Sequence, residues 1–225
     1  MRCDRMCRAL VVLILPACVA LAGCSSDKKT AGEERSAAAV GGLKETRAEL
    51  VAGKTQIDKT VASMNAMRDN TGSLPAEFAT FNEDMKKMDG QAQKIRARAA
   101  DMRERANLYQ TKWRDEMGKV EDPTLRAAAT ARANKVRERY DTITEKATEV
   151  RNAYQPFMTQ MRSVQTYLSN DLTPAAVQGG ATVFDKAAAD GKTVTAKIDA
   201  LVAELDDVAS TLSPTGATGS AATPK

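Results

Sequence analysis

The chain has 225 residues, of which 43% are hydrophobic and only 4% aromatic, with 33 basic and 29 acidic side chains. It contains no histidine, which excludes imidazole bases, histidine-activated nucleophiles and histidine metal ligands. With 13 glycines and 7 prolines, the composition is typical of helical proteins. We therefore predict an all-α protein that is not an enzyme, with no catalytic residue, no cofactor and no nucleic-acid partner.

The N-terminal residues have the features of a lipoprotein signal peptide. Arginines precede an apolar stretch at residues 9–21, which is too short for a bilayer that needs roughly 20 residues. The stretch ends in a tetrapeptide that resembles the lipobox of bacterial lipoproteins: Leu21, Ala22, Gly23 and Cys24. We expect residues 1–23 to be a signal peptide that is removed, and Cys24 to carry the lipid, with palmitate among its acyl chains.

The lipidated cysteine also bears on redox state and location. The other three cysteines precede Cys24, so the mature chain would have neither a free thiol nor a disulfide. Ser25 follows the cysteine, and it resembles the outer-membrane sorting signal of enterobacterial lipoproteins, in which aspartate favours inner-membrane retention. We predict a lipid-anchored protein of the cell envelope, at the outer membrane and facing the periplasm, with an envelope protein or peptidoglycan as its partner.

Apolar spacing predicts four long helices that form one domain at residues 36–212. Their predicted ranges are 36–70, 75–120, 123–169 and 174–212. A polar tether at 24–35 precedes them, and a disordered tail at 213–225 follows. A capping residue followed by proline begins the third helix (Asp122) and the fourth (Thr173).

Short connections between long helices predict an elongated antiparallel four-helix bundle made of coiled-coil hairpins. The second and third helices can be folded about residues 121–122 so that large side chains face small or medium ones. The facing pairs are Trp113 with Ala133, Ala106 with Tyr140, Ile95 with Val150, Ala92 with Tyr154, Met88 with Phe157, and Phe81 with Val164. Seams that face each other leave no concavity, so we expect no deep cleft.

A few residues interrupt the apolar seams. Pro156 lies inside the third helix and predicts a kink rather than a break. Gly180 and Gly191 lie on the fourth seam, where they would loosen the helix or let a neighbouring backbone come close. Glu116 lies on the second seam and is expected to pair with Arg132 or to be exposed.

Methionine spacing raises the possibility of a soft-metal site. Three Met-x-x-Met pairs are expected at one level near one end of the bundle: Met64 and Met67, Met85 and Met88, and Met158 and Met161. Thioethers bind Cu(I) without histidine or cysteine. The alternative is that these methionines fill irregular gaps in the core.

Charged residues suggest further contacts. Residues 94–139 carry thirteen basic and seven acidic side chains, a net charge of +6. This region would rest on anionic head groups or form a solvated face with i,i+4 pairs. The C-terminal Lys225 resembles the wall-linked lysine of the small Braun-type lipoprotein, so attachment to peptidoglycan is an alternative function. The exposed lengths of the second and third helices also allow a homo-oligomer.

Several segments together resemble an uncharacterised family of bacterial helical lipoproteins that is catalogued only as a domain of unknown function. The segments are residues 113–116, which read Trp-x-x-Glu, 125–126, 137–140, 154–158 and 167–172. The resemblance covers residues 40–212. It implies a lipid-anchored coiled-coil protein and supplies no activity, cofactor or catalytic residue. We predict a non-enzymatic helical scaffold or interaction module.

Overall fold

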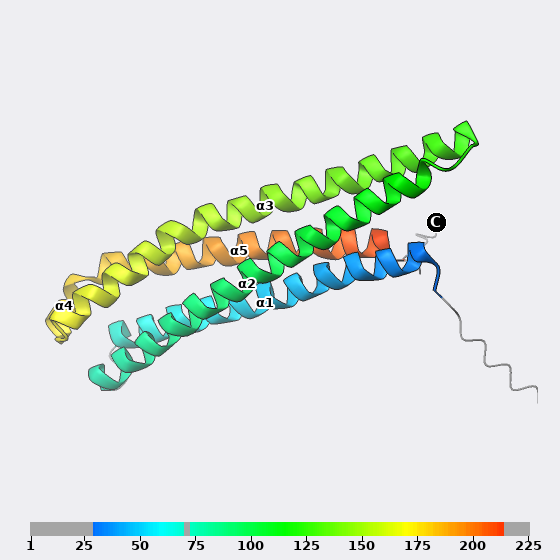
Figure 1. Ribbon diagram of the computed structural model, residues 1–225. Coiled ribbons are helices and arrows are strands. Elements are labelled where there is room, and N and C mark those ends of the chain that lie inside the picture. Colours follow the sequence, from blue (N-terminus) through cyan, green and yellow to red (C-terminus); the bar gives the residue numbers. More distant parts are fainter. Residues whose placement is uncertain (1–28, 70–72, 214–225) are drawn as a thin grey trace, which may run out of the picture.

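The computed structural model describes residues 29–69 and 73–213, and these form a narrow rod of helices (Figure 1). The helices are α1 (Ala31–Asp69), α2 (Leu74–Met117), α3 (Pro123–Asn170), α4 (Pro174–Gly179) and α5 (Ala181–Leu212). No strand occurs within the described ranges. The predicted all-α fold is confirmed.

Three helix boundaries differ from the prediction, and the smallest difference is the end of α2 at Met117 rather than at residue 120. α1 begins at Ala31, inside the expected tether, because Thr30 and Glu33 form a capping box: Glu33 N donates to Thr30 Oγ1 at 3.2 Å, and Thr30 N donates to Glu33 Oε2 at 2.7 Å. The predicted fourth helix is divided into α4 and α5 at Gly180. Two adjacent glycines, Gly179 and Gly180, weaken the helix at this point.

The starts of α3 and α4 lie at the predicted capping residues. Asp122 caps α3, and its Oδ1 accepts a hydrogen bond from Leu125 N at 2.9 Å. Thr173 caps α4, and its Oγ1 accepts one from Ala176 N at 3.2 Å. α3 continues through Pro156 as one helix.

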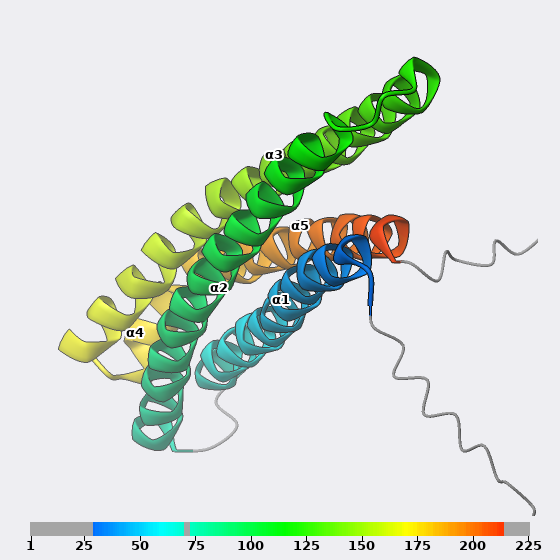
Figure 2. The ribbon, with the colours of Figure 1, turned by 45° about the vertical axis from the view of Figure 1, so that its right-hand side comes forward.

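The helices are arranged in the order α2, α1, α5, α3 around the rod (Figure 2). α1 packs along α2 on one side and along α5 on the other, and α5 also packs along α3. Ion pairs bridge these neighbours: Arg98 to Glu45 at 3.1 Å, Arg47 to Asp206 at 2.7 Å, and Arg139 to Asp207 at 2.8 Å. α2 and α3 approach each other much less closely, so the bundle is closed on three sides and looser on the fourth.

Small residues allow the close contact between α1 and α2. A Cβ added at Gly42 would lie 3.3 Å from the Cα of Met102, so the two backbones nearly touch there. Thr46 Oγ1 hydrogen-bonds to Gly42 O at 2.9 Å and lies 3.2 Å from Arg98 O on α2. The first bond lies within α1, and the second reaches a backbone carbonyl of α2, so it helps to fix the position of α2 along α1.

Three of the largest fully buried side chains lie toward the end of the rod that contains α4. Phe81, Phe157 and Phe184, from three different helices, are fully buried. Gly191 of α5 permits this packing, because a Cβ there would lie 3.0 Å from Val61 Cγ2 and 3.3 Å from Phe157 Cε2. Burial of each phenylalanine contributes about 1.5–3 kcal/mol, so this cluster anchors the fold.

The predicted register of α2 against α3 is confirmed at both ends of the pair. At the turn, the guanidinium carbon of Arg132 lies 5.4 Å from the centre of the Trp113 ring, next to the predicted partner Ala133. At the other end, Gln165 Nε2 donates to Asn82 Oδ1 at 2.7 Å. That contact is one residue along each helix from the predicted pair of Phe81 and Val164. The helices therefore face each other as expected, but they separate between these points.

Candidate functional site

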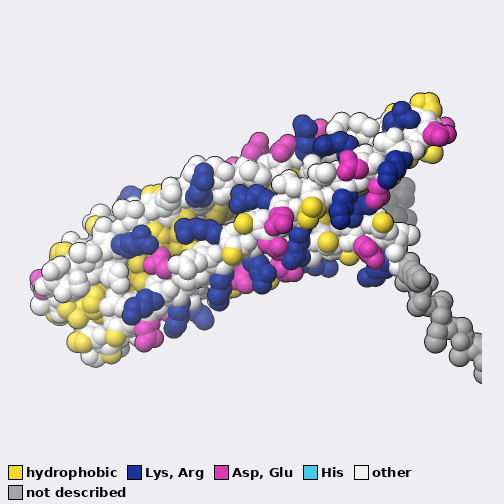
Figure 3. Space-filling view, viewed as in Figure 1, with side chains coloured by type: hydrophobic (Ala, Val, Ile, Leu, Met, Phe, Trp, Pro, Cys, Tyr) yellow, Lys and Arg dark blue, Asp and Glu magenta, His cyan; other side chains and the backbone are white. Residues whose placement is uncertain are grey.

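A groove of about 390 Å³ lies between α2 and α3 at mid-length of the rod. Its apolar floor comes from α1 and α5, and residues of that floor include Leu50, Ile57, Ile198, Leu201 and Leu205. Its walls come from the facing helices: Ala92, Ile95, Ala99 and Met102 of α2, and Ile143, Ala147, Val150 and Tyr154 of α3. Figure 3 shows hydrophobic surface between the two helices, with basic side chains along it.

This groove overturns the prediction that the seams leave no concavity. Ala92 and Tyr154, and Ile95 and Val150, were expected to close the seam, but all four line the groove and are only partly buried. Ala147, on the same predicted seam, is exposed.

The opening has a steric cause. Ile95 leans onto α1, where its Cδ1 lies only 2.7 Å from the position that a Cβ of Gly53 would occupy. It therefore fills a notch in α1 instead of reaching toward Val150. The alanines beside it, Ala99 and Ala147, are too small to bridge the remaining space.

The charged side chains that line the groove all have one sign. Arg96 and Arg103 of α2 and Arg151 of α3 line it, and no aspartate or glutamate does. Within residues 29–69 and 73–213, these three arginines form no ion pair and no hydrogen bond. By contrast, Arg98 and Arg105 on the neighbouring face of α2 both pair with Glu45. The groove therefore carries positive charge that the described side chains leave uncompensated.

Helix register places two of these arginines opposite each other. Antiparallel helices have the same rise per residue, so fourteen residues along each helix from the Asn82–Gln165 contact lead to Arg96 on α2 and Arg151 on α3. These two arginines therefore lie at about the same level of the rod, on opposite sides of the groove. Both are exposed, so solvent screens their mutual repulsion while they add positive charge to the groove rim.

Tyr154 lines the groove, but its hydroxyl lies beneath the groove surface. Its hydroxyl is buried and has no hydrogen-bond partner in the described part of the chain. Burial raises the pKa of Tyr154 to about 12, the nearby charge of Asp89 adds to the rise, and Arg162 and Arg96 oppose it. The phenol is therefore neutral at physiological pH and keeps its proton as a hydrogen-bond donor.

The six methionines of the predicted soft-metal layer all lie in the core. Met64, Met67, Met85, Met88, Met158 and Met161 are each at most 4% exposed and belong to one hydrophobic cluster. This burial agrees with the alternative that the methionines fill gaps in the hydrophobic core. Cu(I) binding stays a prediction. Among the described residues, no group of three or more Asp, Glu, Cys or His side chains is arranged to hold a metal.

Glu116 has a partner that the sequence analysis did not identify. It pairs with Arg35 of α1 at 2.6 Å, not with Arg132, because α1 begins earlier than predicted and reaches the end of α2. The hydrogen bond from Arg35 lowers the pKa of Glu116. Arg132 instead lies over Trp113, which supports the role of Trp113 as a packing anchor. The capping box at Thr30 was the signal that would have placed Arg35 here.

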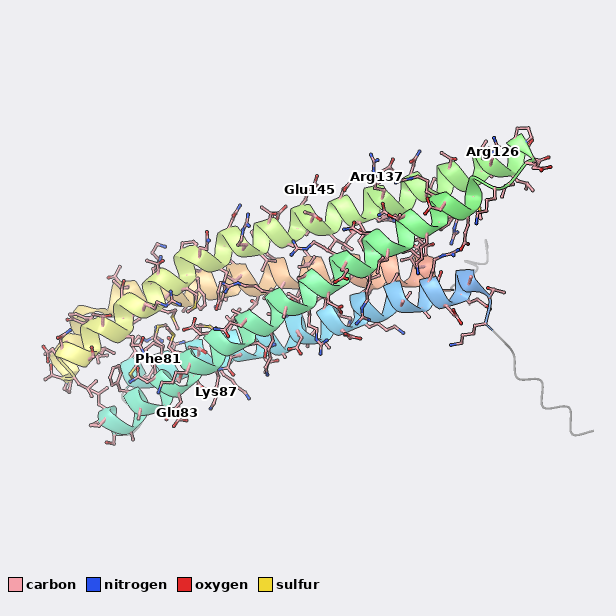
Figure 4. The ribbon with its side chains drawn as sticks, viewed as in Figure 1. Phe81, Glu83, Lys87, Arg126, Arg137 and Glu145 are labelled. Carbon is pink, nitrogen blue, oxygen red and sulfur yellow. The ribbon has the colours of Figure 1, made fainter. Side chains whose placement is uncertain are left out.

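The turn between α2 and α3 projects beyond the ends of α1 and α5 (Figure 2). We call residues 117–131 the hairpin tip. Arg126 ties it together, because its guanidinium donates to Val120 O at 2.6 Å and to Glu121 O at 3.1 Å. Leu125 is 63% exposed and precedes Arg126, which lies at the end of the hairpin (Figure 4).

The remaining predicted positions lie outside the described residues. These are Leu21, Ala22, Gly23 and Cys24 of the lipobox, and the C-terminal Lys225. Of the helices within residues 29–69 and 73–213, none has a segment long and apolar enough to span a bilayer.

Comparison with known proteins extends only to a family. A family model described as "Protein of unknown function (DUF2959)" matches residues 26–212, which includes every described helix. The predicted resemblance to an uncharacterised family is therefore confirmed. No curated protein and no solved structure matches the chain.

Proposed function

We propose that this chain, which belongs to the DUF2959 family of proteins of unknown function, is a lipid-anchored, non-enzymatic interaction module of a bacterial cell envelope. Its anchor is the lipid on Cys24. The rod serves as a scaffold, and the hairpin tip is its contact element.

The observation that carries the proposal is the ion pair between Arg35 and Glu116. It fixes the start of α1 beside the end of α2, so the hairpin tip and the N-terminal end of the domain lie at the same end of the rod. Cys24 precedes α1 by only seven residues, which span at most about 25 Å. A lipid at Cys24 would hold the tip within reach of the membrane surface or of a protein embedded in it.

The chemistry of the tip suits such a contact. Leu125 is exposed at the start of α3, and basic side chains stand close by at Lys119 and Arg126. The tip also carries Glu121 and Asp122, so its charges balance, and the exposed Leu125 is the side chain that can enter the head-group region or contact a protein partner.

Lipidation is tested by feeding cells a clickable palmitate analogue and recovering the protein. We expect the wild type and Cys18→Ser to be labelled and Cys24→Ser to be unlabelled. Cys18 is the matched control because it lies just upstream, in the apolar stretch. Equal labelling of Cys24→Ser would contradict the anchor.

Interaction through the tip is tested by photo-crosslinking in intact cells. A photoreactive amino acid replaces Leu125, or Glu145 as the control. Glu145 is exposed on the outer face of α3, away from the tip (Figure 4). We expect adducts to lipid or to one envelope protein at position 125 only, and fewer of them in Cys24→Ser. Equal adducts at both positions would contradict a role for the tip.

A further inference from the structure

We propose that the groove between α2 and α3 binds one long-chain fatty acid, with its acyl chain along the apolar floor and its carboxylate between Arg96 and Arg151. This site goes beyond the proposed anchor function and does not depend on it, because it uses neither Cys24 nor the hairpin tip.

The volume of the groove fits a single acyl chain. An apolar cavity of about 150 Å³ takes up one benzene, so 390 Å³ has room for roughly fifteen carbon atoms. Along α2 the groove extends from Met88 to Arg103, about 22 Å at 1.5 Å per residue. One acyl chain occupies about half of a hydrocarbon core of about 30 Å, so it can lie within this length.

The same dimensions disfavour bulkier occupants. A helix about 10 Å across and as long as the groove occupies roughly 1,700 Å³, so a groove of 390 Å³ could enclose only one face of it. A two-chain phospholipid would likewise exceed the space.

The charges favour a carboxylate. Arg96, Arg103 and Arg151 have no acidic partner in the described ranges, and no acidic side chain lines the groove to repel an anion. A guanidinium binds a carboxylate through two parallel hydrogen bonds, and the exposed side chains of Arg96 and Arg151 are available for such a pair at the rim of the groove.

The direct test is calorimetric titration of the full chain, isolated with its lipid and as Cys24→Ser, with saturated fatty acids of 8 to 20 carbons. Each buried CH2 should raise affinity about four-fold, until the chain fills the groove near 14 to 16 carbons and affinity levels off. Hexadecanol, which lacks the charge, should bind at least ten-fold more weakly than hexadecanoate. A continued rise to 20 carbons would show partition into a loose apolar surface and overturn the proposal.

Two matched pairs of variants localise the site. Arg96→Gln combined with Arg151→Gln should weaken hexadecanoate binding about ten-fold, whereas Arg137→Gln, an exposed arginine on the outer face of α3 (Figure 4), should not. Ala147→Phe should fill the groove and abolish binding, whereas Ala97→Phe, exposed but outside the groove, should bind normally. Circular dichroism checks that all variants are folded. Wild-type affinity in Ala147→Phe would overturn the proposal.

Other occupants give distinct results. If the groove holds the chain's own acyl group, Cys24→Ser will bind hexadecanoate and the lipidated chain will not. If it holds a second copy, light scattering will show a dimer that Ala147→Phe disrupts and that hexadecanoate does not affect. Either result would contradict a fatty-acid site.

Discussion

The central packing of the rod can be tested by making the same substitution at two helical glycines. Gly191 is buried on α5 between α1 and α3, and a Cβ there would lie 3.0 Å from Val61 Cγ2 and 3.3 Å from Phe157 Cε2. Gly90 is on α2, and nothing lies within 4 Å of its added Cβ. Both are inside long helices. Gly→Ala therefore raises the helix propensity by the same amount at the two positions, but it adds a steric contact only at Gly191.

The two effects have opposite signs. Replacement of a mid-helix glycine by alanine stabilises a helix by about 1 kcal/mol, and Gly90→Ala should gain this amount in full. At Gly191 the added methyl group requires Val61 and Phe157 to shift by a few tenths of an ångström. Phe157 is 0% exposed, and overpacking of this kind costs about 1–3 kcal/mol. The free energy of unfolding should therefore fall by about 1 kcal/mol in Gly191→Ala, and the two variants should differ by about 2 kcal/mol.

Urea denaturation followed by helical circular dichroism measures this difference. For a domain of this size, 1 kcal/mol corresponds to about 2–4 °C in Tm, so a thermal scan gives an independent estimate. If Gly191→Ala stabilised the protein as much as Gly90→Ala does, the close approach of α5 to α1 and α3 would be refuted.

Three further predictions concern buried side chains. Tyr140→Phe should not lower stability at neutral pH, because its buried hydroxyl has no partner in the described chain and an unpaired group costs about 1–3 kcal/mol. Burial raises the pKa of Tyr140 to about 12, above its unfolded value of about 10. The wild type should therefore lose stability as the pH rises from about 10 to 12. Urea midpoints over this range should fall less for Tyr140→Phe than for the wild type. Phe157→Ala should cost about 3–5 kcal/mol in the same urea assay, and a loss below 1 kcal/mol would contradict its place in the core. If the methionines bind Cu(I), titration should show a site that is lost in Met64→Leu/Met67→Leu, and equal uptake by both proteins would dismiss it.

Apolar spacing predicted much of this fold because a long helix reveals its buried face every third and fourth residue. The cap and proline at Asp122 and Thr173 placed two helix starts correctly. The missed start of α1 was a local signal too, since Thr30 and Glu33 form a standard capping box. The break at Gly180 lies at two adjacent glycines. Whether two glycines interrupt a helix depends on how well the neighbouring turns are packed, and the sequence does not show that packing.

The groove could not be predicted in the same way. Heptad spacing identifies the face of each helix that points inward, but it does not say which two of four helices pack most closely. That depends on notches such as Gly53, which draws Ile95 toward α1, and on backbone contacts such as that of Gly42 with Met102. Ile95 and Val150 have side-chain sizes that suit a pair in contact, but the same two residues can also stand on opposite walls of an open groove. Their sizes therefore do not distinguish the two arrangements.

The most direct measurement is the reactivity of single cysteines introduced by Ala147→Cys, Ala187→Cys and Ala97→Cys, in a background whose four native cysteines are replaced by serine. Ala147 lies on the groove, Ala187 is fully buried in the core, and Ala97 is exposed outside the groove. An open fourth side predicts that a small maleimide modifies the thiol at position 147 nearly as fast as at 97 and far faster than at 187. Protection of position 147 to the level of 187 would show that α2 and α3 close upon each other, and would contradict the groove.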